Sequence, residues 1–202
     1  MGDRRIRGFT LIELIITLAV VGVVLAFAVP SFREFMLNSR MSGTANDLLA
    51  GVQLARSEAI KRQRPVAICP STSPSAAPPT CVAGTTWSSA GSPAGWVVWV
   101  DDNNNATPDD AEVVVSPHDP VAPTLSITSN ASVLSYQPNG FMQAAVAAPP
   151  PFPLVLICDE RGDVAAGDNY RKRALVLSTT GRPAIQRTRV EIDALLDAGL
   201  CP

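Results

Sequence analysis

A single carboxylate, Glu13, lies inside a run of about 20 mostly apolar residues, Phe9 to Val29, which is long enough to cross a bilayer. An ionisable side chain inside such a run costs on the order of 3 kcal/mol, so it is retained mainly where it pairs with an opposite charge. The chemistry that Glu13 offers is therefore charge neutralisation. Its partner must be a cation that reaches the same apolar surroundings.

Gly8 and Phe9 lie at the start of the apolar run and mark a place where the chain can be cut. A secretory signal carries its cleavage site after a shorter apolar core, whereas here the small residue precedes the core. Cleavage between Gly8 and Phe9 removes residues 1–8 and leaves the apolar segment on the mature chain. The cut also creates a positive amine on Phe9, and Glu13 can neutralise such an amine on its own or a neighbouring helix.

The stretch that carries these residues, GFTLIELIITLAVVGVVLAFAVPSF, closely resembles the class III signal of type IV pilins and type II secretion pseudopilins. The resemblance implies that a prepilin peptidase cuts after Gly8 and methylates the new N-terminal Phe9. It also implies that Glu13 neutralises the amine of a neighbouring subunit and sets the stagger as each subunit enters a filament. The alternative is a glutamate tolerated near a helix end, and it does not explain the full match to the motif.

Charge and length favour a single membrane-anchored subunit. The chain has 202 residues and a formal net charge of -2. Removing residues 1–8 leaves 13 basic and 17 acidic residues, so the mature chain is mildly acidic and would bind nucleic acid only through a local patch. The basic residues before the apolar run place the N-terminus in the cytoplasm. This predicts one pass through the inner membrane, with the remainder of the chain in the periplasm.

Four cysteines, Cys69, Cys81, Cys158 and Cys201, fit an oxidising periplasm. The chain has no C-x-x-C pair and one histidine, so a structural zinc site has little support. Four cysteines allow three disulfide connectivities. The sequence favours Cys69 with Cys81, which closes a short loop rich in Ser, Pro and Ala, and Cys158 with Cys201, which joins the C-terminus to a predicted strand.

One long helix followed by short strands must position these residues. Beyond Pro30 the apolar residues recur at three- and four-residue spacing, which predicts an amphipathic helix that continues to residue 63. The residues of this stripe are Met41, Ala45, Leu48, Leu49, Val52, Ala55, Ala59 and Ile60. Seven β-rich runs follow, separated by clusters of Pro, Gly, Asn and Asp. They are Pro65 to Cys69, Trp96 to Val100, Glu112 to Ser116, Thr124 to Ile127, Ser132 to Gln137, Leu154 to Cys158 and Ala174 to Ser178.

The predicted fold class is α+β, with a long N-terminal helix packed on an antiparallel β-rich head. The first half of this helix is predicted to be the transmembrane part. The expected division is a leader peptide (1–8), a transmembrane and filament-core helix (9–29), an amphipathic continuation (30–63) and a periplasmic head (64–202).

The segments LLAGVQLARSEAIKRQRPVAICPS, GWVVWVD and RALVLSTTGRP, spread over most of the chain, resemble the GspH/FimT family of pseudopilins and minor pilins. The resemblance implies a structural subunit without a cofactor, in either a type IV pilus or a type II secretion pseudopilus. Its implied partners are other pilins, the prepilin peptidase and an inner-membrane assembly platform. The cysteine pattern and the RPVAICPS strand are closer to the minor pilins of type IV pili.

The segment DDNNNATPDDAE has the spacing of a calcium loop. Its oxygen-bearing residues at positions 1, 3, 5, 7, 9 and 12 are Asp101, Asn103, Asn105, Thr107, Asp109 and Glu112. However, Ala106 replaces the glycine of the sharp turn, and a predicted strand precedes the loop. Because Asn and Asp clusters commonly turn chains, the sequence favours a solvated hairpin loop over a calcium site.

A basic cluster in the last third of the chain offers a second kind of site, a contact with phosphates. Its members are Arg161, Arg171, Lys172, Arg173, Arg182, Arg187 and Arg189. Some FimT-like proteins are thought to bind incoming DNA through a Gly-Arg-x-Arg motif, which makes a DNA-binding minor pilin for natural transformation the alternative function. Gly181 and Arg182 match this motif, but Ala184 replaces its second arginine, and Arg187 is a possible substitute. Acidic residues interleave the cluster, which equally predicts a charge-mixed solvated face.

The sequence gives no argument for an enzyme. His118 and Asp119 are predicted to lie in a proline-flanked loop, where a surface histidine is the ordinary interpretation. The chain has no G-x-S-x-G segment and no cysteine with a histidine nearby in sequence.

Overall fold

One helix, α1, runs from Leu11 to Arg62 and contains Pro30. It belongs to a computed structural model that describes residues 9–89, 91–143, 152–162, 165–166 and 169–188. The chain forms two compact units, Met1–Ser39 and Arg40–Pro202, and the boundary between them lies within α1. The bounds of α1 confirm the predicted helix to within about two residues at each end.

The second half of α1 carries the predicted apolar stripe, and this stripe is the centre of the core. Six of its residues are almost fully buried: Met41, Ala45, Leu48, Val52, Ala55 and Ala59. They share one hydrophobic cluster with strands of two sheets, so the helix is held by side-chain packing along a single face. Leu49 is partly buried beside this cluster. Ile60 corrects the prediction, because it lies in the last helical turn and is 45% exposed.

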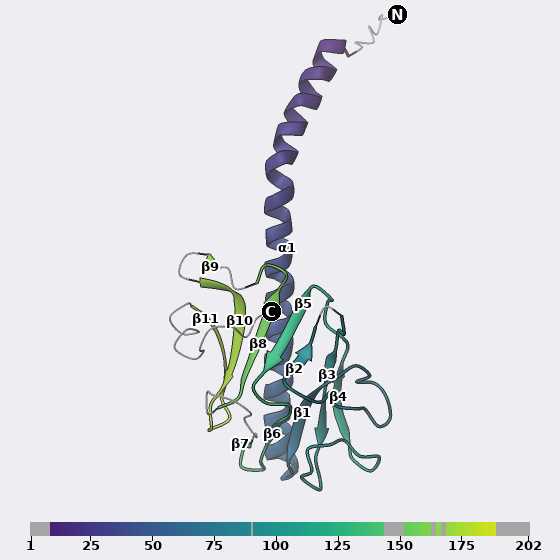
Figure 1. Ribbon diagram of the computed structural model, residues 1–202, viewed down its shortest axis with the longest axis vertical. Coiled ribbons are helices and arrows are strands. Elements are labelled where there is room, and N and C mark those ends of the chain that lie inside the picture. Colours follow the sequence, from purple (N-terminus) through teal and green to yellow (C-terminus); the bar gives the residue numbers. More distant parts are fainter. Residues whose placement is uncertain (1–8, 90, 144–151, 163–164, 167–168, 189–202) are drawn as a thin grey trace, which may run out of the picture. The chain divides into compact units, whose positions relative to one another are not determined.

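The described part of the head contains two antiparallel sheets (Figure 1). Sheet A has the order β4 (Val114–His118), β3 (Gly95–Val100), β1 (Val66–Ser71), β6 (Leu134–Tyr136) and β7 (Met142–Gln143). Sheet B has the order β11 (Pro183–Thr188), β10 (Asn169–Leu177), β8 (Leu154–Asp159), β5 (Leu125–Ser129) and β2 (Thr86–Ser88), and β9 (Ala165–Ala166) pairs with β10. The predicted fold class, a long helix on an antiparallel β-rich head, is confirmed.

Burial on both faces explains why the central strands β1 and β8 are largely apolar. In β1, Val66 and Ile68 join the cluster around α1, whereas Ala67 and Cys69 lie in a second cluster with Val97 and Trp99 of β3. Strand β8 alternates in the same way between the main cluster and a third one. Because successive side chains point to opposite faces, both faces of these strands are buried.

Hairpin turns from both sheets meet on α1. The Arg56 guanidinium donates from Nε to the carbonyl oxygen of Gly140 at 3.2 Å and from Nη2 to that of Thr180 at 3.0 Å. The buried Tyr136 hydroxyl donates to the carbonyl oxygen of Gly181 at 3.1 Å, and burial raises the pKa of this phenol. Gly181 has a φ of 78°, which favours glycine. These contacts tie the β6–β7 turn and the β10–β11 turn to the same helical turn.

All seven predicted strands are present, with shifted ends, and the described residues form four further strands that were not predicted. Three of the four are only two or three residues long: β2, β7 and β9. The fourth, β11, reads PAIQRT and begins with a proline. Short edge strands of this composition carry little intrinsic β preference, because their pairing depends on the neighbour that the fold supplies.

Gly95 gives a direct test of the β3–β4 pairing. A Cβ at this position would lie 1.8 Å from the carbonyl oxygen of His118. We expect Gly95→Ala to lower the free energy of unfolding by about 3 kcal/mol, because the strands must move apart. Thermal unfolding of the detergent-solubilised chain, followed by near-ultraviolet circular dichroism, measures the change.

Gly43→Ala is the matched control, since a Cβ on this exposed helical residue meets no atom within 4 Å. It should raise stability by about 1 kcal/mol through helix propensity. Equal stability of the two variants would contradict the observed strand register.

Candidate functional site

The start of α1 is built around the carboxylate of Glu13. The backbone N–H of Thr10 donates to Glu13 Oε2 at 3.5 Å, and the backbone N–H of Glu13 donates to Thr10 Oγ1 at 3.2 Å. With Leu11 as the first helical residue, this pair is a capping box. Gly8 lies outside the described residues, and Phe9 is exposed. Thr10 was not among the predicted site residues, although the spacing T-x-x-E is a recognised signal for a helix start.

The helix that follows this cap is apolar and exposed. Its large apolar side chains between Phe9 and Phe35 are at least half exposed, with Phe9 and Leu11 near 80%. An 18-residue window of α1 reaches a mean hydropathy of 2.8, and α1 is the one helix of the described residues that is long and apolar enough to span a membrane. A large exposed apolar surface of this kind is typical of a segment that contacts a membrane or other apolar chains.

The first predicted disulfide is present. Cys69 in β1 is bonded to Cys81, with their Cα atoms 5.6 Å apart, and it closes the loop rich in Ser, Pro and Ala. Cys69 belongs to the buried cluster that contains Val97 and Trp99, and Cys81 packs against this cluster. Cys158 is also disulfide-bonded. Cys201 lies outside the described residues, so the pairing of Cys158 with Cys201 stays a prediction.

The segment from Asp101 to Glu112 is the connection between β3 and β4, as the hairpin interpretation predicts. Asp101 is buried, and its two carboxylate oxygens accept the backbone N–H groups of Asn105 and Ala106, each at 3.0 Å. Glu112 accepts the N–H groups of Asp102 at 2.8 Å and of Asp109 at 3.1 Å.

Three other calcium candidates, Asn103, Asn105 and Asp109, are hydrogen-bonded to one another within this loop. The side-chain amides of Asn103 and Asn105 donate to Asp109 Oδ2 at 2.7 and 3.0 Å. Within the described part of the chain, no three His, Cys, Asp or Glu side chains are grouped as a metal would need. These oxygens hold the loop in shape, and calcium binding stays an untested prediction.

The basic cluster is divided between buried and exposed positions. Arg161 forms a bidentate ion pair with Asp159, in which Nε lies 3.0 and 2.9 Å from the two carboxylate oxygens. Lys172 and Arg173 are 5% and 4% exposed. Burial lowers the pKa of the Arg173 guanidinium, and the nearby charge of Arg187 lowers it further.

Arg182 and Arg187 are the exposed members of the cluster in the described part of the chain, Arg171 is partly exposed, and Arg189 lies outside that part. Arg187 lies five positions after Arg182, so roughly 17 Å of extended chain lies between them. Among the described members of the cluster, the strands therefore do not form one exposed patch. DNA binding through this cluster stays a prediction, for which the geometry gives no specific support.

His118 corrects the loop prediction, because it is the last residue of β4. Its ring stacks on Trp96 with centroids 3.7 Å apart and planes 11° apart. Nε2 lies 3.9 Å from Asp47 Oδ2 on α1, and Nδ1 lies 2.8 Å from the carbonyl oxygen of Asp119. The histidine thus links α1, β3 and β4. The sequence alone could not reveal this stack, because it depends on the pairing of Trp96 with His118 across the strands.

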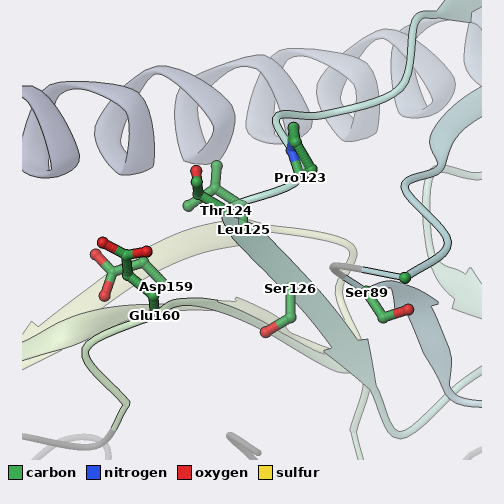
Figure 2. Close-up of a pocket in the computed structure, with 8 residues that line it drawn as sticks. Ser89, Pro123, Thr124, Leu125, Ser126, Asp159 and Glu160 are labelled. Atoms are coloured by element: carbon green, nitrogen blue, oxygen red, sulfur yellow. The ribbon is translucent and has the colours of Figure 1, made fainter.

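A pocket of about 460 Å³ lies where β5 begins and β8 ends (Figure 2). Its lining residues are Ser89, Gly91, Pro123, Thr124, Leu125, Ser126, Asp159 and Glu160. Thr124 Oγ1 is buried and has no hydrogen-bond partner in the described structure. Asp159 is already paired with Arg161, so its carboxylate stabilises the end of β8 in sheet B.

Known protein families match this chain in both the helix and the head. Residues 44–181 match the family model described as type II transport protein GspH, and residues 3–29 match the prokaryotic N-terminal methylation motif. Over 47 residues the chain is 45% identical to the fimbrial protein EcpC of Eikenella corrodens, and over 46 residues it is 46% identical to the type IV major pilin protein PilA of Myxococcus xanthus. Each match covers 23% of this chain, and they cover 29% and 21% of those relatives.

Among solved structures, the chain is similar to the type IV minor pilin FimU of Pseudomonas aeruginosa. That crystal structure aligns with a TM-score of 0.46 and 21% identity, over 75% of this chain and 92% of FimU. In a second crystal form of FimU the TM-score is 0.44.

Asp101 supplies a test of what the loop needs. Asp101→Ala removes the acceptors of two backbone N–H groups, so we expect a loss of about 2 kcal/mol of stability, equal in calcium and in chelator. Asp110→Ala, at an exposed position of the same loop, should change stability little. The measurement is the melting temperature of the solubilised chain. Wild-type protein that melts lower in chelator, with no such difference in Asp101→Ala, would instead establish a calcium site.

Proposed function

The chain belongs to the GspH family of type II transport proteins, and on this premise we propose that it is a structural subunit of a type IV pilus or a type II secretion pseudopilus. The observation that carries the proposal is the two-part helix. Its first half exposes an apolar surface that includes the capping box of Thr10 and Glu13, and one face of its second half is buried by the head. A subunit of this form can be stored in a membrane and then built into a helical core.

Before assembly, the chain is anchored in the inner membrane. The basic residues of the leader favour a cytoplasmic N-terminus, and the apolar first half of α1 is long enough for a single pass. The head then lies in the periplasm. The Cys69–Cys81 disulfide supports this location, because disulfides persist in oxidising compartments.

Processing prepares the subunit for the filament. A prepilin peptidase cuts between Gly8 and Phe9, and the match to the N-terminal methylation motif supports both the cut and the methylation of Phe9. The N–H of Thr10 belongs to a peptide bond that the cut leaves intact, so the capping box survives in the mature chain. The cap therefore prepares a rigid helix end for assembly.

Assembly moves the apolar helix from lipid into a core of similar helices, at an inner-membrane platform and among other pilins. A carboxylate has about four lone-pair sites, so the bond from Thr10 does not exhaust Glu13. The remaining capacity accepts the positive amine of a neighbouring Phe9. Gene neighbourhood distinguishes the two kinds of filament, because pilus-assembly and secretion operons differ.

Gly8→Glu tests the processing step. In cells with an active prepilin peptidase we expect this variant to accumulate as an unprocessed precursor of larger apparent mass, while the wild type loses residues 1–8. Immunoblotting of membrane fractions measures the difference. Normal processing of the variant would remove the basis for the proposal.

Glu13→Gln separates the capping role from the charge. Glutamine retains an acceptor for the Thr10 N–H, as in a capping box, but cannot neutralise an amine. We expect Glu13→Gln to reach the membrane and to be missing from sheared filaments, as we also expect for Glu13→Val. Incorporation of Glu13→Gln at the wild-type level would show that the cap alone is needed and that charge pairing is not.

A further inference from the structure

A second pocket, of about 260 Å³, lies on the face of sheet A opposite to the cluster around α1. Ala67 of β1 pairs with Trp99 of β3 on one side and with Ser135 of β6 on the other, and Ser135 pairs with Gln143 of β7. Residues that pair directly point to the same face of a sheet. Ser135 and Gln143 both line the pocket, so it opens on this face.

Two segments far apart in sequence form the walls of this pocket. The connection between β3 and β4 lines one side, and residues in and just before β6 line the other: Asp101, Asn104, Ala106, Ser132, Val133 and Ser135. The volume is several times the roughly 30 Å³ that one water molecule occupies in the liquid. The pocket therefore has room for a small organic group.

Asp101 brings a buried negative charge to the pocket. The residue is 1% exposed, and its carboxylate accepts the backbone N–H groups of Asn105 and Ala106, which are neutral donors. The adjacent cation, Arg64, pairs with Asp102 at 2.9 Å, and the ion pairs of the described residues leave Asp101 without a cationic partner. Buried charges in proteins are normally paired. A cation in the pocket would complete this site.

Ser135 brings a hydroxyl group that has no partner. The residue is 8% exposed, and its buried Oγ makes no hydrogen bond in the described structure. The large majority of buried side-chain polar atoms have a hydrogen-bond partner. Because a hydroxyl can accept as well as donate, Ser135 can bind a ligand that carries N–H donors. The charge of Asp101 and the hydroxyl of Ser135 thus favour the same kind of ligand.

The arrangement of acceptors favours an ammonium group over other cations. A guanidinium binds a carboxylate best through two parallel bonds, but both oxygens of Asp101 already accept a backbone N–H. Calcium takes about six to eight oxygen ligands, and Asp101 is the one carboxylate among the residues that line this pocket. An ammonium instead has three N–H donors that can reach three separate acceptors.

We propose that this pocket binds the primary ammonium group of a small ligand. The carboxylate of Asp101 balances the charge, and the Ser135 hydroxyl and the side-chain oxygen of Asn104 accept two of the N–H groups. The alkyl stem lies against Val133 and the methyl group of Ala106. A free diamine and the lysine side chain of a peptide offer the same chemistry. The site does not depend on the proposed filament function, because Glu13 and the cleavage step take no part in it.

Titration of the full chain in detergent with butylammonium chloride tests this site. The backbone amide signals of Asn105 and Ala106, observed by nitrogen-15 nuclear magnetic resonance, report on it because both N–H groups donate to Asp101. We expect shifts of these signals that saturate with ligand. Tetramethylammonium chloride at equal ionic strength carries the same charge without an N–H donor, so it should not produce them.

Ser135→Ala separates ligand binding from stability. It removes an acceptor for a charged donor, so the affinity for butylammonium should fall by about tenfold. Without ligand its melting temperature should be unchanged or higher, because the hydroxyl has no partner to lose. Ser116→Ala in β4 is the matched control, since it makes the same change in the same sheet outside the pocket and should retain wild-type affinity.

Asp101→Asn removes the charge with little change of size and should abolish saturable binding. Near-ultraviolet circular dichroism verifies that this variant is folded at the temperature of the titration. The two sources of the ammonium are compared by titrating 1,4-diaminobutane and N-acetyl-lysine methylamide. Tighter binding of the diamine indicates a free amine, and tighter binding of the lysine derivative indicates a peptide.

Three results would overturn the proposal. Shifts that do not saturate would show that water alone fills the pocket. Equal shifts with tetramethylammonium would show screening of the acidic loop by any cation. Equal affinity of the wild type and Ser135→Ala would show that the amine binds elsewhere.

Discussion

The packing of the second half of α1 against two sheets is the constraint on which the rest of the structure depends. Small residues at Ala45, Ala55 and Ala59 allow the strands to approach the helix, while Leu48 and Val52 fill the space between the sheets. Arg56 completes this contact by holding turns from both sheets. One face of the second half of α1 packs against both sheets. The first half of α1 is not needed for this packing, so its exposed apolar side chains can contact a membrane or other helices.

That first half combines an exposed apolar surface, which a water-soluble helix would avoid, with a carboxylate, which a membrane-spanning helix would avoid. The structure shows Glu13 bound to the start of its own helix through Thr10, so the charge already has a structural role. In the proposed filament, the amine of a neighbouring Phe9 would give the same carboxylate a second role. The cap sets where the helix begins. Under the proposed function, the charge of the same side chain would also bind a neighbouring subunit.

Periodicity predicted the helix, its buried stripe and the central strands, because burial on a helix or a pleated strand repeats at fixed intervals. The prediction fails where contacts rather than periods decide. Ile60 continues the stripe in sequence but lies in the last turn, where less of the head covers it. Arg173 and Arg161 look like surface charges and are buried, because only the fold supplies the sheet and the carboxylate that surround them. Thr10 is a different case, since its spacing from Glu13 is that of a capping box and could have been recognised in the sequence.

The central claim is that a processed form of this chain enters a filament. Mass spectrometry of the N-terminal peptide recovered from sheared surface filaments tests it most directly. The account predicts a peptide that begins at N-methylated Phe9. Filaments that lack the chain, in cells where its membrane form still carries residues 1–8, would contradict it.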